Sequence, residues 1–119
     1  MEKIIKLKLN KEFKRAYGRG KSFVHPGVIT YIVKNRLGVV RVGITTGKKI
    51  GNAVSRNRAR RVILAAFSDC LPHIRGGYDI VFVGRVRTPA LKSHYVRAGI
   101  EAHLKSAGIW VGEDEISAN

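Results

Sequence analysis

The sequence predicts a single α+β domain in which helices cover a small β-sheet, and three observations support this class. The chain has 119 residues, of which 45% are hydrophobic, and this suits one domain with one modest core. Helical and strand-like patterns follow one another in the order helix, two or three strands, helix, strand, helix. No internal repeat or linker divides the chain. We therefore expect a domain over residues 1–112 and a flexible acidic tail over residues 113–119.

The first predicted element is a short helix. A mixed apolar and basic arm over residues 4–9 leads to Asn10, a residue type that favours the N-cap position. The helix then covers residues 11–17 and ends at one of the two glycines that follow.

Two strands are expected next. Residues 28–33 and 39–46 are rich in β-branched side chains, and the short connection over 35–38 predicts that they form a hairpin. Residues 22–25 add a possible strand before them.

The second half of the chain contains the main helix, a strand and a last helix. The main helix covers residues 55–71 and ends at Pro72. Residues 78–84 are almost continuously apolar, which predicts a central strand. Pro89 precedes a last helix over residues 90–106.

The charge of the chain points to a polyanionic partner. Lys and Arg number 23 against 8 Asp and Glu, a formal net charge of +15. Thirteen basic residues and no acid lie between Glu12 and Asp69. A basic face without a partner is disfavoured, because so large a field opposes the compact state.

Other classes of protein fit the sequence poorly. It contains no run of the ~18 apolar residues that a membrane span needs, and its first residues do not resemble a secretory signal. Cys70 is the one cysteine, so no internal disulfide forms, and its apolar helical surroundings predict a buried, inert thiol. We expect a cytoplasmic location.

The polypeptide also lacks the side chains of a self-sufficient enzyme. A two-metal nuclease needs several carboxylates, but only Asp69 and Asp79 lie between positions 13 and 100. The four histidines show no metal-ligand spacing, and no nucleotide-binding loop is present. We expect neither catalytic residues nor a metal or cofactor site in the chain.

The segment 48–61 carries the most information about function. It reads KKIGNAVSRNRARR and holds six basic residues and no acid: Lys48, Lys49, Arg56, Arg58, Arg60 and Arg61. Cations at a helix N-terminus oppose the helix dipole by roughly 0.3–1 kcal/mol each, so mere solvation of this helix end is disfavoured. Bound phosphate would remove that conflict and would accept hydrogen bonds from the free N–H groups.

At about 100° per residue, the arginines of the main helix fall into two pairs. Arg56 and Arg60 lie about 20° and 60° from Ile63, on the shoulder of the core stripe. Arg58 and Arg61 lie roughly 140° and 160° away. The core stripe itself consists of Ala59, Ile63, Ala66, Phe67 and Cys70. Two basic faces indicate two RNA surfaces, or one RNA that wraps around an edge.

Aromatic residues lie among these charges. Phe13, Tyr17, Phe23 and Tyr31 all fall in the basic half of the chain. Stacking of an unpaired base on such a ring contributes ~1–3 kcal/mol. We expect Phe23 in the core, while Phe13, Tyr17 and Tyr31 fit either a core position or a ligand contact.

The string Lys-Lys-x-Gly-Asn-Ala-Val-x-Arg-Asn-Arg-x-Arg-Arg over 48–61 resembles the signature of the bacterial ribonuclease P protein family. The strand RVGITT before it is also similar, as is the spacing of Phe13, Tyr17, Gly20 and Tyr31. The resemblance covers about residues 10–107.

The resemblance implies a fold and a function. The fold is an α-β sandwich of order α-β-β-β-α-β-α with a four-stranded sheet, as in the second domain of a small-subunit ribosomal protein. Its signature helix joins two neighbouring parallel strands by a left-handed crossover, although the pattern alone favours the right-handed form. The function is that of a 1:1 ribonucleoprotein that removes the 5′ leader of precursor tRNA, with Mg²⁺-dependent chemistry in the RNA subunit.

The resemblance also implies site residues. Those of the leader cleft are Phe13, Tyr17, Tyr31, Arg56 and Arg60. Those that bind the RNA subunit are Lys48, Lys49, Asn57, Arg58 and Arg61, although Asn57 fits equally a structural role at the turn into the helix. Two positions depart from the family pattern: Leu64 replaces a frequent basic residue, which shortens the basic stripe, and Gly47 replaces a frequent serine.

Two other functions fit the sequence less well. A structural RNA-binding protein of the ribosome fits a basic α+β domain, but the signature string argues against it. A protein nuclease that acts alone is opposed by the small number of carboxylates.

Overall fold

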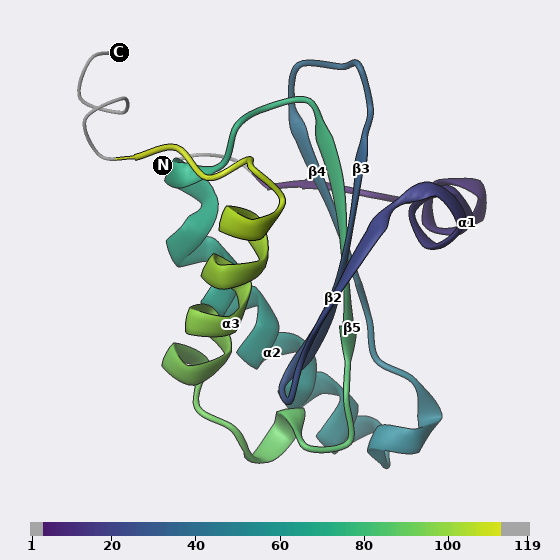
Figure 1. Cartoon of the computed structure of the whole chain (residues 1–119). Coiled ribbons are helices and arrows are strands. Elements are labelled where there is room, and N and C mark those ends of the chain that lie inside the picture. The colour runs from purple at the N-terminus through teal and green to yellow at the C-terminus, as the bar shows by residue number, and fades with distance from the viewer. Residues whose placement is uncertain (1–3, 113–119) are drawn as a thin grey trace.

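A five-stranded mixed β-sheet forms the centre of the computed structural model, which describes residues 4–112 (Figure 1). The strands are β1 (Ile5–Lys6), β2 (Lys21–His25), β3 (Val28–Lys34), β4 (Val40–Thr45) and β5 (Tyr78–Gly84), in the spatial order β1-β4-β5-β3-β2. The helices are α1 (Asn10–Arg19), α2 (Ala53–Cys70) and α3 (Ser93–Ser106), with 3-10 turns η1 (Lys48–Ile50), η2 (Leu71–His73) and η3 (Thr88–Ala90). The predicted acidic tail over 113–119 lies outside the described residues.

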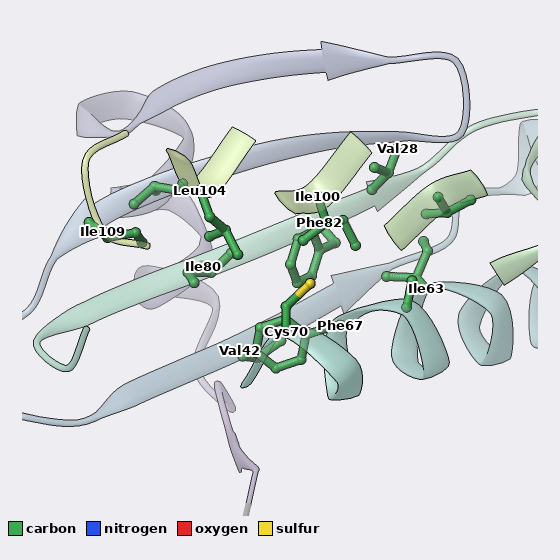
Figure 2. Close-up of a cluster of buried hydrophobic side chains, with 13 residues drawn as sticks. Val28, Val42, Ile63, Phe67, Cys70, Ile80, Phe82, Ile100, Leu104 and Ile109 are labelled. Atoms are coloured by element: carbon green, nitrogen blue, oxygen red, sulfur yellow. The ribbon is translucent and has the colours of Figure 1, made fainter. Parts of the chain in front are cut away.

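The helices cover both faces of the sheet. The main core fills the space between the sheet and the pair α2 and α3, and Figure 2 shows Phe67 of α2 and Phe82 of β5 within it. The ring centroids of these two residues are 5.3 Å apart. α1 lies on the opposite face, where Ala16 packs in a second cluster with Leu7 and Val81. The chain is therefore a sandwich with the sheet in the middle.

β5 is the central strand, as its apolar sequence predicts. It pairs with β4 in parallel and with β3 antiparallel along its whole length. Ile80 and Phe82 face the main core, while Val81 faces α1, so both faces of the strand are buried. α2 joins the parallel neighbours β4 and β5. The left-handed sense of this crossover stays a prediction.

The predicted hairpin of β3 and β4 is wrong, because β5 lies between them. The short connection turns at Arg36 (φ 59°) and Gly38 (φ 74°), and the Asn35 side-chain amide donates to the carbonyl of Val39 at 3.0 Å. These local contacts close the turn without pairing the two strands. β3 instead forms its hairpin with β2, which confirms the strand expected before it.

Two details at the N-terminal end also differ from the prediction. The arm contains the fifth strand, β1, whose two residues pair in parallel with Arg41 and Val42 of β4. The N-cap of α1 is Leu9 and not Asn10, because the Glu12 carboxylate accepts the N–H groups of Lys8 and Leu9 and so takes over the capping function.

The predicted core stripe of α2 is confirmed. The buried residues of the helix are Ala59, Ile63, Ala66, Phe67 and Cys70, the five of the helical wheel. Burial raises the pKa of the Cys70 thiol to about 11, as expected for an inert thiol. Among residues 4–112, no helix combines the length and apolar character that a membrane crossing requires.

Candidate nucleic-acid interface

The turn into α2 places its basic residues. Asn52 is the N-cap, and its Oδ1 accepts the N–H of Ser55 at 3.0 Å. Gly51, with φ 137°, lets the chain leave η1 and enter the helix in this direction. α2 therefore starts one turn before its first arginine.

Arg60 of α2 extends over β4. Its Nη1 donates to the carbonyl of Ile44 at 2.8 Å and its Nη2 to Thr46 Oγ1 at 3.3 Å. Ile44 lies beyond the short β1, which pairs only with the first part of β4. The Arg60 guanidinium thus covers a part of the β4 edge that β1 leaves free.

A cavity of about 150 Å³ lies along this edge, and we call it the β4 edge groove. Phe13 of α1 lines one side, Arg60 and Leu64 of α2 line another, and Gly43 belongs to its floor. The remaining lining residues are Ile4, Lys6, Leu7, Val42 and Ile44. A second hollow of about 310 Å³ is lined by the same Phe13 and by Asn10, Lys14, Tyr17 and Thr45, and we include it in the β4 edge groove.

The aromatic residues differ in their contacts. Phe13 packs on the backbone of Gly43, where a Cβ would lie 2.6 Å from the Phe13 Cζ. Tyr17 meets Tyr31 edge to face, with ring centroids 5.0 Å apart, and is 41% exposed. Phe23 stacks on His103 and packs against the main core, so its predicted core position is confirmed.

The structure brings most of the predicted cleft residues together. Phe13, Tyr17 and Arg60 line the two hollows, which share Phe13, and Tyr31 contacts Tyr17 from β3. Arg56 is half-buried one turn before Arg60 and lines neither hollow. Leu64, the departure from the family pattern, makes the α2 side of the groove apolar beyond Arg60.

The predicted RNA-binding residues form a separate, exposed set. Lys48 and Lys49 lie in η1, and Asn57, Arg58 and Arg61 lie on α2. Within residues 4–112, none of these side chains takes part in an ion pair or hydrogen bond. Asn52, and not Asn57, supplies the side-chain hydrogen bond at the turn into α2.

Sequence reasoning missed Gly43, Lys14 and Thr45. A glycine inside a strand pattern signals close approach of another group, so Gly43 could have been found. Lys14 and Thr45 come together only through the placement of α1 on the sheet, which no local pattern reveals.

A polar network holds α1 in that place. Arg41 of β4 donates to both carboxylate oxygens of buried Asp79, at 2.8 Å and 2.7 Å, and to Glu12 Oε2 at 2.6 Å. Burial acts to raise the pKa of Asp79, but hydrogen bonds from Arg41 and Asn35 outweigh it and leave that pKa below its usual value. Backbone N–H groups of Leu9 and Lys8, together with Arg41, lower the pKa of Glu12. Both carboxylates are therefore held in their charged form.

Acidic and metal-ligating side chains do not cluster in the described part of the chain. Across residues 4–112, no three His, Cys, Asp or Glu side chains lie close enough together to hold a metal ion. The interface consists instead of cations, aromatic rings and backbone, which are the groups that bind nucleic acid.

Comparison with known proteins identifies the family of the chain. A family model described as Ribonuclease P matches residues 1–108. The ribonuclease P protein component of Caldanaerobacter subterraneus subsp. tengcongensis is 38% identical over 109 residues, which cover 92% of this chain and 94% of that protein. The structure of the Staphylococcus aureus RNase P protein superposes with a TM-score of 0.77 at 30% identity, covering 91% of this chain and 99% of that one. The Thermotoga maritima RNase P protein gives a TM-score of 0.74 at 27% identity, covering 85% and 96%. The chain therefore belongs to the ribonuclease P protein family.

Proposed function

We propose that this chain is the protein subunit of a ribonuclease P, which binds the ribonuclease P RNA and the 5′ leader of precursor tRNA. In this role it assists the endonucleolytic removal of the leader. The RNA subunit carries the Mg²⁺-dependent chemistry, and one protein binds one RNA. The lone, buried cysteine suits a reducing compartment, and we place the complex in the cytoplasm.

The observation that carries the proposal is the division of the α2 arginines. Arg60 reaches the β4 edge groove, beside the rings of Phe13 and Tyr17, while Arg58 and Arg61 are exposed on another face of the helix. One helix can thus serve two RNA segments at once.

The groove itself suits a single strand of RNA. An unpaired nucleotide offers a flat base and one phosphate, and the groove offers aromatic rings, a guanidinium and Lys14. A regular duplex hides its bases from such rings. The structural RNA-binding alternative is not favoured, because the family model covers nearly the whole domain.

Cleavage of precursor tRNA at low Mg²⁺ tests the proposal. The reaction is run with the protein alone, with a bacterial ribonuclease P RNA alone, and with both. We expect mature 5′ ends to appear efficiently only in the mixture. Cleavage by the protein alone, or no stimulation of the RNA, would contradict the assignment.

A further inference from the structure

The segment between β5 and α3 is strongly basic, and neither the groove nor the predicted RNA-binding set uses it. No acid occurs between Asp79 and Glu101, whereas the segment holds Arg85, Arg87 and Lys92. We call these three residues, together with Val86 and Pro26, the β5–α3 loop surface.

The fold places this surface at the end of the molecule where α2 begins. Ile50 of η1 packs on the backbone of Gly84, with its Cδ1 3.1 Å from the position that a Cβ on Gly84 would take. η3 packs against α2 on the other side of the loop. Figure 1 shows the end of β5, η3 and the start of α2 at the same lower end of the molecule. The turn η1, which carries Lys48 and Lys49, therefore lies beside the end of β5 at which the loop begins.

The loop is held in one conformation. Thr88 Oγ1 accepts the N–H of Arg85 at 2.8 Å and donates to the carbonyl of Gly27 at 2.7 Å. The Arg85 Nη1 donates to the carbonyl of His25 at 3.0 Å. A loop fixed in this way loses little conformational entropy when it binds a partner.

The outer side chains of the loop are free to bind. Arg87 and Lys92 are exposed, and within residues 4–112 neither makes a hydrogen bond or an ion pair. Val86, between Arg85 and Arg87 in the sequence, is 64% exposed. A hollow of about 310 Å³ is lined by Arg85, Val86, Arg87 and Pro26. Two arginines around a shallow hollow that has no acidic lining residue match a phosphate backbone.

We infer that the β5–α3 loop surface binds the phosphate backbone of the ribonuclease P RNA, as a continuation of the face that carries Lys48 and Lys49. The inference rests on the proposed function. It assigns the loop to the RNA subunit and not to the leader, because no residue of the loop lines either hollow of the β4 edge groove.

Binding of the protein to a bacterial ribonuclease P RNA at several salt concentrations tests this assignment. The variant is R87A/K92A, which removes two exposed cations that make no hydrogen bond or ion pair with other residues of 4–112. The matched control is K34A/K105A, which removes the same charge elsewhere: Lys34 pairs with the first residue of β5, and Lys105 lies in the last turn of α3. Thermal melting of both variants verifies that they fold.

We expect R87A/K92A to lower the slope of log affinity against log salt by about 1.4–1.8, which corresponds to two lost phosphate contacts. The factor by which the variant binds RNA more weakly than the wild type should then shrink about ten-fold between ~50 and ~200 mM salt. The control should change the slope by less than half as much. In the assembled holoenzyme, R87A/K92A should keep the wild-type preference for leader-bearing over mature tRNA.

Three results would overturn the inference. They are an unchanged slope, an equal change in both double variants, or a loss confined to leader-bearing substrate. If the loop binds a protein and not RNA, R87A/K92A should bind the RNA as tightly as the wild type does, and the inference would be wrong. Failure of the proposed function looks different, because the wild-type protein would then not stimulate the RNA at all.

Discussion

The depth of the β4 edge groove depends on the absence of a side chain at position 43. Phe13 packs on the bare backbone of Gly43, and this contact brings α1 close to the strand. Arg60 covers the free edge from the other side through the carbonyl of Ile44. Two residues from distant parts of the chain thus define the width of the groove.

Gly43→Ala should force the Phe13 ring out of its place. The new methyl would lie 2.6 Å from the Phe13 Cζ, so we expect a loss of about 1–3 kcal/mol in the free energy of unfolding. Urea denaturation measures it. Gly18→Ala is the matched control: nothing lies within 4 Å of its Cβ position, and alanine should stabilise α1 by about 0.5–1 kcal/mol. Equal effects of the two substitutions would contradict the packing described here.

Arg60→Ala should weaken binding of precursor tRNA to the holoenzyme about ten-fold, or ~1.4 kcal/mol, through the loss of a charged hydrogen-bond donor. Binding of mature tRNA, which has no leader, should change little. Equilibrium binding of the two RNAs at saturating protein measures the difference. Arg61→Ala on the other face is the control and should not discriminate between them. Equal losses with Arg60→Ala would remove Arg60 from the leader site.

The position of α1 depends on ion pairs that cross from the helix to two strands. Glu12 caps the start of the helix and binds Arg41 of β4, which in turn binds Asp79 of β5. Asp79 is only 1% exposed, so its charge is balanced almost entirely by protein groups. Phe13 and Tyr17 reach the groove because this network fixes the helix that carries them.

Asp79→Asn should destabilise the protein by on the order of 3 kcal/mol, because Arg41 loses its buried partner. The pKa values of Asp79 and Glu12 lie below those of the unfolded chain, so their stabilisation is complete above about pH 4.3 and is lost as the pH falls further. Urea denaturation between about pH 2.5 and about pH 7 should show that the free energy of unfolding falls less steeply with acid in the variant than in the wild type. Glu101→Gln, in a surface pair on α3, is the control and should cost less than about 0.5 kcal/mol.

Mild acid should lower the free energy of unfolding through the histidines where α3 packs on β2 and β3. His103 is buried, with its Nδ1 2.8 Å from Thr30 Oγ1, and burial lowers its pKa, as it does for His25. The unfolded chain therefore takes up protons below about pH 6.5 that the folded chain does not, and stability falls as the pH falls. Urea midpoints between about pH 7.5 and pH 5 measure this slope. His103→Gln should flatten this slope, and an unchanged slope in that variant would contradict the role of His103.

Elements with a regular local pattern could be predicted from the sequence, and contacts across the sheet could not. The helical period alone identified the core stripe of α2 and separated Arg60 from Arg58 and Arg61, and the structure places Arg60 in the groove. The hairpin prediction failed because β5 pairs with β3 and β4 over seven and six residues, which outweighs a short loop. β1 has only two residues, too few to show a period. The width of the groove follows from such long-range pairing.

The molecule as a whole carries its positive charge on several sides of one small domain. The β4 edge groove, the exposed face of α2 with η1, and the β5–α3 loop surface are built from different elements. One protein of net charge +15 can thus hold more than one RNA segment at fixed relative positions. Such positioning of RNA segments is the contribution that the proposed function assigns to the protein.

The affinity of the protein for RNA should fall steeply with salt. Each neutralised phosphate contributes about 0.7–0.9 to the slope of log affinity against log salt, because bound counterions are released. A titration from ~50 to ~400 mM salt measures the number of contacts directly. A flat response would contradict an electrostatic interface.

Chemical labelling of the Cys70 thiol can measure how often the core of the protein opens. The thiol is the sole one in the chain and is buried in the core, so a thiol reagent reaches it only when the core opens. Its pKa of about 11 also keeps the reactive thiolate scarce while the protein is folded. The labelling rate then reports how often the folded protein opens. Since RNA binds the folded form, labelling should slow as more of the protein is bound, and one sulfur atom would record the occupancy of the protein by RNA.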